Sequence, residues 1–544
     1  MVALFFFIVS LLVVGFGQPH VSSLLSVVAS GVGFALFWLG LLRVEGRGRR
    51  FFISGAWFFG VQLIQLSWLA SPTFQGTYIY FVYGALALWL GAQFALLSLL
   101  FPKEGPISGR KMFGIAGFWT LIEWGRLFVL CGFAWNPVGL SMTGFPVQGQ
   151  LAAVFGVFGL SFIVIVVNLL AVNAFLKPDK MRLVAWGSAF LFPFLFGGLH
   201  MIYHDGQKKG DVCHALLLQT ALLPDQKDLC SGKEHRYVHP YLQWREIVKG
   251  INAHVGRSYD LIVLPEYALP FSAHVPVYPL KEMERVIGAD LQEAGSLLKG
   301  PFAEKRGEEW YVSNAFVLQA LANRYGAEII SGLDASEGEK SYNAAFHFIP
   351  EREEVFRYEK RILLPLAEYL PFSFLKPLVA RYGIVNFFTP GEEAKVSRGK
   401  LPMSLSICYE ECFPSLMREG RKAGAELFVN VTNDGWYPYS RLPEEHFIHG
   451  RVRAIENGVP LLRACNTGVT AGVDSLGRTV ARFANKEGKF ELEKGALSLS
   501  MSTYSYKTLY TFFGDGAILG LSLLCMLMVF VRKKNPLAEK LSLN

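Results

Sequence analysis

Long apolar runs dominate the first two hundred residues of the chain. A helix of about 20 mainly apolar residues matches the thickness of the hydrocarbon core of a bilayer. Seven such runs precede residue 204, and an eighth follows a long polar region. They cover residues 2–17, 22–42, 51–71, 78–101, 112–134, 150–176, 183–203 and 509–531. The pattern predicts a membrane domain of seven helices and one further membrane helix near the C-terminus.

The region between these runs has a different pattern, in which short apolar segments alternate with amphipathic ones. The apolar segments cover residues 213–219, 261–264, 327–332, 344–349, 403–407, 425–430 and 460–464. Helical patterns cover residues 280–298, 313–325 and 444–456. Short, fully apolar strands separated by helices are typical of an α/β layered domain with buried sheets. About 300 residues are enough to bury a substantial core.

The basic residues between the apolar runs predict how the chain is oriented. Lys and Arg are retained on the cytoplasmic side, whereas short translocated loops tend to lack them. Every second loop carries such residues: Arg43, Arg47, Arg49, Arg50, Lys103, Arg110, Lys111, Lys177, Lys180 and Arg182. The loops at 18–22, 71–77 and 136–149 carry no charge. Both chain ends are therefore predicted to be cytoplasmic.

This orientation divides the chain into four parts. Residues 1–203 form the membrane domain with seven helices, and residues 204–507 form a catalytic domain outside the cytoplasm. Residues 508–532 form the eighth membrane helix, and residues 533–544 form a cytoplasmic tail. The first run lacks a basic leading segment and a small-residue cleavage site, so we expect a retained helix.

Composition supports two unlike parts and limits the classes of function. The 544 residues are 52% hydrophobic and only 18% charged, which is too apolar for an ordinary soluble enzyme. The net charge of +8 lies partly in the basic loops and does not indicate nucleic-acid binding. No nucleotide-binding motif is present, so no cofactor is expected. Cys213 and Cys230 lie where a disulfide is permitted, although their spacing does not establish one.

The stretch that carries the most chemistry ends at Cys408. The apolar run 404–407 stops at this cysteine, and Tyr409 and Glu410 follow it. A thiol at a strand end becomes a nucleophile when neighbouring groups generate or stabilise its thiolate. Glu266 follows another buried run and can accept the thiol proton, while Lys360 can stabilise a developing oxyanion. Taken singly, each has an ordinary interpretation: an inert buried thiol, a turn carboxylate and a solvated lysine.

Two other sets of polar residues need an interpretation. Glu123 and Arg126 lie three positions apart within the fifth apolar run, and we expect them to pair because charges are costly in lipid. His446 and His449 also lie three positions apart on a predicted helix. A metal site is one interpretation, but no third strong ligand stands near them. Packing or hydrogen bonding on the helix face is therefore expected, and no metal.

Four motifs occur in the order and spacing of the nitrilase superfamily, whose core is an αββα sandwich. They are Leu264-Pro265-Glu266, Tyr358-Glu359-Lys360, Ile407-Cys408-Tyr409-Glu410 and Asn433-Asp434-Gly435-Trp436. With seven predicted spans before the catalytic region and one after it, the chain resembles the membrane branch of that superfamily, the apolipoprotein N-acyltransferases. The resemblance covers nearly the whole chain.

The resemblance implies roles for individual residues. It implies that Glu266 is the base, Lys360 the oxyanion stabiliser and Cys408 the nucleophile. Supporting or substrate-binding roles are implied for Asn343, Glu368, Tyr409, Glu410 and Trp436.

It also implies a reaction and a location. Members take an acyl chain from a phospholipid, typically phosphatidylethanolamine, and pass it through a cysteine thioester to the α-amine of a diacylglyceryl-cysteine lipoprotein. The implied location is the bacterial inner membrane, with the catalytic domain on the periplasmic side. The partners are the two lipid substrates and the bilayer, and we expect a monomer.

The chain departs from the family pattern in three places. Pro365-Leu366-Ala367-Glu368 replaces the usual Pro-Phe-Gly-Glu, Tyr437-Pro438-Tyr439 follows Trp436 where Phe-Gly is usual, and the interval 271–312 is long.

Two other functions are compatible with the same sequence features. A membrane-tethered amidase or nitrilase-type hydrolase uses the same three residues with water as acceptor, and a membrane scaffold or transporter needs no reactive cysteine.

Overall fold

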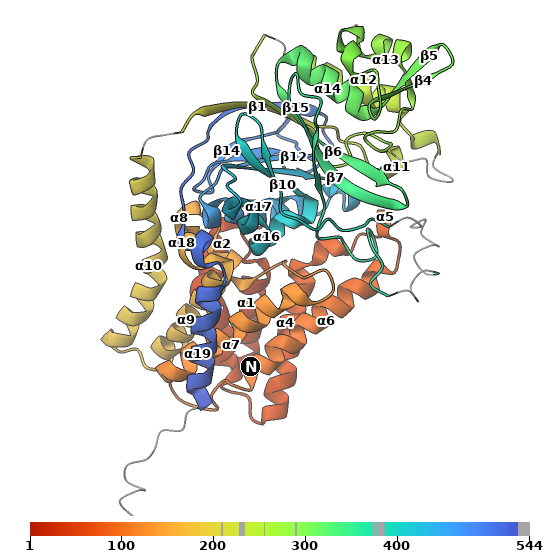
Figure 1. The fold of residues 1–544 in the computed structure, drawn as a ribbon. Coiled ribbons are helices and arrows are strands. Elements are labelled where there is room, and N and C mark those ends of the chain that lie inside the picture. The colour runs from red at the N-terminus through yellow and green to blue at the C-terminus, as the bar shows by residue number, and fades with distance from the viewer. Residues whose placement is uncertain are drawn as a thin grey trace, which may run out of the picture.

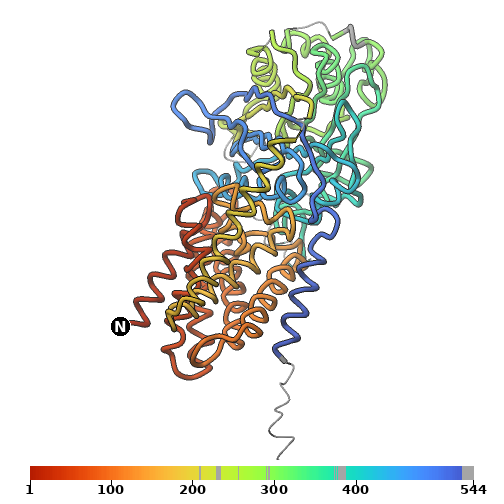
Figure 2. The backbone as a smooth tube through the Cα atoms, turned by 90° about the vertical axis from the view of Figure 1, so that its left-hand side faces the viewer, coloured from red at the N-terminus to blue at the C-terminus, as the bar shows by residue number. Residues whose placement is uncertain are grey.

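The structure is a computed structural model that describes residues 1–207, 210–227, 234–254, 256–288, 291–372, 374, 377 and 387–530. Helices from the first two hundred residues form one end of the molecule, and the sheets form the other (Figure 1). Figure 2 shows the same division from the side, with the last helix, in blue, returning from the sheets to the helical end. Cys230 lies outside the described residues, so the structure does not test whether it pairs with Cys213.

The helical domain contains a helix within each apolar run that the sequence indicated. The bounds are α1 Val2–Phe16, α2 Ser23–Val28, α3 Phe34–Leu41, α4 Arg47–Gln65, α6 Ile79–Ser98, α7 Gly109–Gly125, α9 Ala152–Leu176, α10 Lys180–Asp205 and α19 Gly516–Phe530. A π-helical turn at Ala29–Gly33 joins α2 to α3, so this pair forms one continuous helical segment. Short helices α5 Pro72–Gln75, α8 Pro146–Gly149 and α18 Leu509–Phe513 lie in the connections.

Four helices of the described residues are long and apolar enough to cross a membrane, by length and composition. They are Ser23–Leu41, Ile79–Ser98, Ala152–Leu176 and Lys180–Asp205. Val2–Phe16 and Gly516–Val529 are apolar but shorter. α4 begins with Arg47, Arg49 and Arg50, and α7 has 17 residues. The number of membrane crossings, seven before the catalytic domain and one after it, stays a prediction.

The catalytic domain is built on two six-stranded sheets within the described residues. The first has the order β15-β1-β2-β6-β7-β8, with bounds β15 Gly495–Ser502, β1 Val212–Gln219, β2 Leu261–Val263, β6 Glu328–Glu337, β7 Lys340–Phe348 and β8 Phe356–Glu359. The second has the order β14-β13-β12-β11-β10-β9, with bounds β14 Thr479–Arg482, β13 Ala471–Val473, β12 Leu461–Cys465, β11 Leu427–Thr432, β10 Pro402–Ile407 and β9 Val396–Arg398. The central strands β1, β2 and β6 of one sheet and β10, β11 and β12 of the other are parallel.

The sheets pack face to face over an apolar core. Leu217, Val263 and Ile330 from the first sheet pack in one buried cluster with Leu405 and Val429 from the second. The outer faces are covered by helices α12 Pro240–Asn252 and α14 Asn314–Tyr325 on one side, and by α16 Pro414–Lys422 and α17 Leu442–Asn457 on the other (Figure 1). This arrangement confirms the predicted αββα sandwich.

The long interval 271–312 folds as a small unit of its own. It contains β3 Tyr278–Pro279, α13 Leu280–Ile287, β4 Ala303–Arg306 and β5 Glu309–Val312, with sheet order β3-β5-β4. Figure 1 places this unit at the end of the molecule remote from the helical domain. The helix predicted over 280–298 is wrong in its second half, because α13 ends at Gly288, whose left-handed φ of +67° terminates the helix.

Candidate active site

Cys408 stands where β10 ends and a short 3₁₀ turn, Cys408–Cys412, begins. Its φ is +52°, a left-handed conformation that is unusual for a residue with a side chain. Such strained residues cluster at functional sites. The side chain is buried, with 9% of the residue exposed. Burial raises the pKa of the Cys408 thiol well above its ordinary value, the charge of Glu266 adds to the rise, and the Lys360 ammonium opposes it. The thiol is therefore protonated at neutral pH and needs a base when it attacks.

Glu266 follows β2 by three residues and is held against the neighbouring strand. A methyl group on Gly332 of β6 would lie 2.5 Å from the Glu266 Cα, so only glycine fits there. The Oε1 atom of Glu266 accepts a hydrogen bond from Asn343 Nδ2 at 2.8 Å and from Lys360 Nζ at 3.3 Å. The carboxylate is buried, and it is the charged group that acts most strongly on the Cys408 thiol. It is therefore placed to serve as the base.

Lys360 follows β8 directly and is almost completely buried, with 1% of the residue exposed. Its Nζ donates to Glu368 Oε1 at 2.8 Å as well as to Glu266. Burial lowers the pKa of Lys360, but the negative charges of Glu368 and Glu266 outweigh burial and raise this pKa well above its ordinary value. Lys360 is therefore a fixed cation beside the thiol, which is the charge that an oxyanion needs.

Glu368 and Asn343 complete this buried network. Asn343 Nδ2 donates to Glu368 Oε1 at 2.9 Å, and the Leu364 backbone N–H donates to Glu368 Oε2 at 2.9 Å. The carboxylate stands on a turn in which Leu366 has a φ of +69°. The family motif has its glycine at the next position, Ala367, so this chain makes the turn with a left-handed leucine.

Glu410 is fully buried and binds the backbone on either side of the site around Cys408. Its carboxylate accepts hydrogen bonds from the backbone N–H groups of Ile407 at 2.8 Å, Arg361 at 2.6 Å and Ile362 at 3.2 Å. The Tyr358 hydroxyl donates to it at 3.0 Å. Glu410 thus ties the strand end that carries Cys408 to the segment that carries Lys360.

Tyr409 connects the site to the helical domain. Its hydroxyl donates to the Gly132 carbonyl at 3.0 Å and accepts from the Ala134 N–H at 3.2 Å. Its ring stacks on Trp135, with centroids 5.6 Å apart. Gly132, Ala134 and Trp135 belong to the loop that follows α7. Cys408, the residue before Tyr409, therefore lies at the end of the sandwich that contacts the helical domain.

Trp436 lies apart from this network. Its side chain is 44% exposed, and its ring contacts Phe74 of α5, with centroids 6.4 Å apart. The predicted supporting role of Trp436 stays a prediction. Glu123 and Arg126 pair as expected, at 3.9 Å, and Glu123 Oε1 also accepts from the Val138 N–H at 2.8 Å.

A second buried network lies on the other side of Cys408. His446 Nδ1 lies 2.8 Å from Asp434 Oδ1, and His446 Nε2 lies 3.2 Å from the Cys408 carbonyl oxygen. Arg463 donates to Glu411 at 2.7 Å and to Asp434 Oδ2 at 3.2 Å. Burial raises the pKa of Asp434, but His446 and Arg463 outweigh it, and the net pKa lies below its ordinary value. Among the described residues, no group of three or more His, Cys, Asp or Glu is arranged to hold a metal ion.

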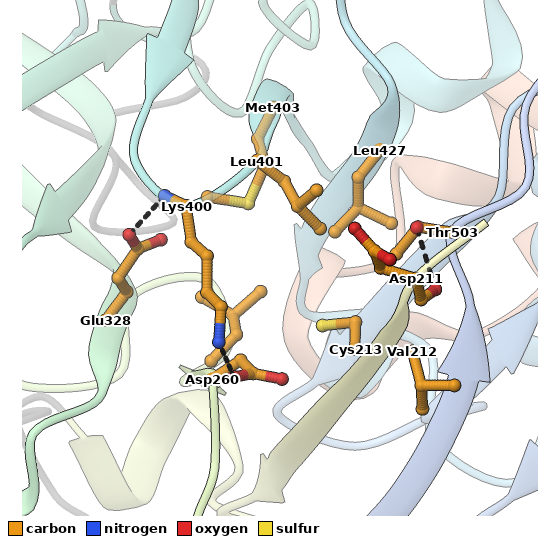
Figure 3. A pocket seen from close by; sticks show the side chains of 11 residues that line it. Asp211, Val212, Cys213, Asp260, Glu328, Lys400, Leu401, Met403, Leu427 and Thr503 are labelled. Carbon is orange, nitrogen blue, oxygen red and sulfur yellow. Dashed lines mark hydrogen bonds and ion pairs between the residues drawn. The ribbon is translucent and has the colours of Figure 1, made fainter.

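A hollow in the sandwich lies away from this site. A cavity of about 80 Å³ opens between the amino-terminal ends of β2 and β10, the opposite ends of the strands from Glu266 and Cys408. Figure 3 shows Cys213 pointing toward it and Lys400 paired with Asp260 across it. Burial raises the pKa of the Cys213 thiol to about 12, so this cysteine is a poor nucleophile. The cavity contains none of the predicted site residues.

Three site residues were not predicted from the sequence. Asn430 of β11 donates to the Cys408 carbonyl at 3.3 Å, Tyr358 donates to Glu410, and Trp135 stacks on Tyr409. Asn430 carried a signal, because it is an amide inside an otherwise apolar strand that must find a partner. Tyr358 and Trp135 carried none, because their partners lie far away in sequence.

Two family models match parts of this chain. A family model described as "Apolipoprotein N-acyltransferase N-terminal domain" matches residues 6–170, and one described as "Carbon-nitrogen hydrolase" matches residues 240–489. Among solved structures, an amidase from Nesterenkonia sp. is 18% identical, covers 55% of this chain and 92% of its own, and has a TM-score of 0.34.

Full-length relatives are more similar. A protein from Chlamydia trachomatis named "Apolipoprotein N-acyltransferase" is 32% identical over 97% of this chain and 97% of its own length. One of the same name from Chlamydia caviae is 31% identical over 95% of each chain. A helical domain followed by a nitrilase-type sandwich, at this identity over almost the whole length, places the chain in the apolipoprotein N-acyltransferase family of enzymes.

Proposed function

We propose that the chain transfers an acyl chain from a phospholipid, through a thioester on Cys408, to the α-amine of the diacylglyceryl-cysteine at the N-terminus of a lipoprotein. Phosphatidylethanolamine is the proposed donor. The observation that carries the proposal is the meeting of Glu266, Lys360 and Cys408 on the end of the sandwich that contacts the helical domain. Two lipid substrates anchored in one leaflet can reach a thiol held at that end.

The first half-reaction uses the three residues as follows. Glu266 takes the proton of the Cys408 thiol while the sulfur attacks the ester carbonyl of the phospholipid. The Lys360 ammonium stabilises the oxyanion of the tetrahedral intermediate. The carbon–oxygen ester bond then breaks, and the lysophospholipid leaves as an alcohol with the proton from Glu266. The acyl chain remains as a thioester on Cys408.

The second half-reaction runs through the same groups. The neutral α-amine of the lipoprotein attacks the thioester carbonyl, and Lys360 again faces the oxyanion. Glu266 takes a proton from the attacking nitrogen and returns it to the sulfur as the carbon–sulfur bond breaks. The products are an amide and the free Cys408 thiol, so the cycle needs no cofactor.

Asn343, Glu368, Tyr409, Glu410 and Trp436 are proposed supporting residues. Asn343 and Glu368 fix the buried cation by the bonds described above. Glu410 and Tyr409 hold the two backbone segments and the membrane-facing loop. Trp436 is exposed beside Phe74, where an aromatic surface can meet a lipid chain.

We propose that the enzyme works in the bacterial inner membrane as a monomer, with the catalytic domain on the periplasmic side. The alternating charge of the loops supports this orientation. The proposed boundaries are residues 1–203 for the membrane domain, 204–507 for the catalytic domain and 508–532 for the last membrane helix. Residues 533–544 of the proposed cytoplasmic tail lie outside the described residues.

The direct test uses purified full-length protein, phosphatidylethanolamine and a synthetic diacylglyceryl-cysteine peptide. Mass spectrometry is expected to show a peptide with one added acyl chain, and none with Cys408→Ser. A peptide whose α-amine is acetylated serves as the matched control and should stay unmodified. Release of free fatty acid with an unmodified acceptor peptide would instead identify a hydrolase.

A further inference from the structure

We propose that His446 is a positioning residue that holds Cys408 in its strained conformation through the Cys408 carbonyl group. The inference rests on the proposed role of Cys408 as nucleophile. It concerns a residue whose buried contacts the three-residue mechanism above does not use.

The Cys408 carbonyl oxygen receives two side-chain contacts. His446 Nε2 lies 3.2 Å from it on one side, and Asn430 Nδ2 donates to it at 3.3 Å. A left-handed residue with a side chain persists only where its surroundings over-determine it. Cys408 has such a conformation, and two buried donors on its carbonyl fix the peptide plane next to the thiol. The direction of the thiol toward Glu266 depends on that plane.

The imidazole ring of His446 has an oxygen atom facing each of its two nitrogens. Nδ1 faces Asp434 Oδ1 at 2.8 Å. Nε2 faces the Cys408 carbonyl oxygen and also Glu411 Oε1 at 3.2 Å. A carbonyl oxygen only accepts, and an ionised carboxylate only accepts. Both ring nitrogens therefore face oxygen acceptors, and the ring cannot turn over without losing both contacts.

Trp135 extends this arrangement to the helical domain. Its indole ring lies 5.5 Å from the His446 ring and 5.6 Å from the Tyr409 ring, measured between centroids. Trp135 thus contacts both Tyr409, which follows Cys408 in the chain, and His446, which contacts the Cys408 carbonyl oxygen. We infer that docking of the helical domain fixes His446, and that His446 in turn fixes Cys408.

His449 provides a matched control on the same helix. It lies one turn further along α17, is equally buried, and contacts the same Trp135 ring with centroids 5.1 Å apart. Neither of its ring nitrogens has a hydrogen-bond partner in the described structure. A substitution at His449 therefore removes the same packing against Trp135 without touching the Cys408 carbonyl.

The test measures the reactivity of the Cys408 thiol in the full-length protein in detergent. Iodoacetamide is the probe, and mass spectrometry of the Cys408 peptide gives its alkylation rate separately from the other cysteines. His446→Ala is expected to slow this rate by about tenfold to a hundredfold, the factor typical of losing a buried donor. His449→Ala is expected to leave it within about threefold of the natural protein. Equal rates in the two variants would overturn the proposal.

Two conservative variants decide the matter if His446→Ala does not fold. The amide nitrogen of His446→Gln reaches the position of Nε2, whereas that of His446→Asn reaches only the position of Nδ1. The proposal requires Gln to restore most of the alkylation rate and Asn to restore little. Equal rates for Gln and Asn, at equal thermal stability, would show that the ring is merely structural.

These outcomes are separable from failure of the proposed function. Alkylation requires no phospholipid, so the His446 effect is measured even if the natural protein forms no acyl adduct. If acyl transfer does occur, His446→Ala should lower kcat while leaving KM within about twofold, because His446 contacts the nucleophile and not the lipid.

Discussion

At the scale of single residues, the buried charges around Lys360 serve both the stability and the chemistry of the site. Lys360 lies between Glu266 and Glu368, and all three residues are buried. Removing one member of such a group leaves an unpaired buried charge. This destabilises the folded protein by much more than the intact group stabilises it. Loss of activity in a single variant would therefore mix two effects, and a second substitution is needed to separate them.

Lys360→Met is expected to lower the rate of acyl transfer by about a hundredfold to a thousandfold, because the oxyanion loses the cation that stabilises it. It is also expected to destabilise the catalytic domain by about 3–5 kcal/mol. The double variant Lys360→Met/Glu368→Gln removes one of the two unpaired carboxylates. It should regain much of the thermal stability and none of the activity. A double variant as unstable as the single one would contradict this account of the network.

The residues that sequence reasoning found are those at the ends of apolar strands. Glu266 follows β2 of the first sheet and Cys408 ends β10 of the second, so each was recognisable at the end of a buried strand. Their convergence depends on how the two sheets pack, which the pattern of apolar strands alone does not predict. His446 was interpretable only as a helix-face residue. Its partner is a backbone carbonyl whose direction depends on a φ of +52°, and no sequence pattern reports such an angle.

At the scale of elements, the junction between α17 and α9 decides how the two domains meet. α9 is interrupted at Gly156, whose φ of +67° and ψ of −179° are accessible to glycine almost alone. Beyond the break, the Val157 N–H donates to Glu456 Oε1 of α17 at 2.8 Å. A carboxylate of the catalytic domain thus satisfies a backbone group of a helix in the helical domain.

Gly156→Ala is expected to lower the free energy of unfolding by about 2–4 kcal/mol, because alanine adds backbone strain and overpacks this junction. The added methyl group would lie 2.4 Å from Cε2 of Tyr510, which is fully buried. Gly187→Ala in α10 is the matched control, because a methyl group there meets nothing within 4 Å. Thermal unfolding in detergent measures both variants. Equal unfolding temperatures for the two would contradict the importance of the break.

Glu456 is expected to make the stability of the protein depend on pH. Burial raises the pKa of Glu456 to about 7, with Arg453 and the Val157 N–H opposing and Asp515 adding to the rise. In the unfolded chain this pKa is about 4.3, so the folded protein binds the extra proton between the two values. The contribution of Glu456 to the free energy of unfolding is therefore fully present below about pH 4, and it is lost as the pH rises through 7.

Thermal unfolding between pH 4 and pH 8 tests this expectation. From pH 4 to pH 8, the free energy of unfolding of the natural protein should fall by about 3 kcal/mol more than that of Glu456→Gln. Glutamine keeps an oxygen for the Val157 N–H but has no proton to lose. Parallel pH profiles for the two proteins would show that Glu456 is not the titrating group.

The central strands of both sheets and the helices α14 and α17 were predictable, because fully apolar strands and amphipathic helices have clear sequence periods. The outer strands β8, β9, β13, β14 and β15 were not predicted. β15, for example, is a half-buried strand that pairs antiparallel with the distant strand β1, so neither its pattern nor its sequence neighbours indicated it. The three-stranded sheet in the interval 271–312 was not predicted either. Its short strands are only partly buried and contain polar residues, so they lack the apolar pattern of a buried strand.

At the scale of the whole molecule, the loop that follows α7 brings the two domains together next to Cys408. Gly132 and Ala134 bind the Tyr409 hydroxyl, and Trp135 packs against Tyr409, His446 and His449. Trp135 also contacts Trp68, which in turn contacts Tyr437 of the catalytic domain. This chain of aromatic contacts was not predictable, because it joins five segments that are distant in sequence.

Tyr409→Phe tests whether this docking matters for catalysis. The variant keeps the ring that stacks on Trp135 and loses both hydrogen bonds to the loop, which is expected to lower acyl transfer by about tenfold. The unfolding temperature should change by only a few degrees. Tyr358→Phe is an informative comparison, because it removes a hydroxyl from Glu410 within the catalytic domain. An unchanged rate in Tyr409→Phe would show that the docking contact is only structural.

The most direct test of the whole account is intact-protein mass spectrometry after incubation with phosphatidylethanolamine, in the absence of any acceptor. The natural protein is expected to gain the mass of one acyl chain, hydroxylamine should remove that chain, and Cys408→Ser should gain nothing. No adduct on folded, lipid-accessible protein, or an equal adduct on Cys408→Ser, would contradict the thioester mechanism and the role assigned to Cys408.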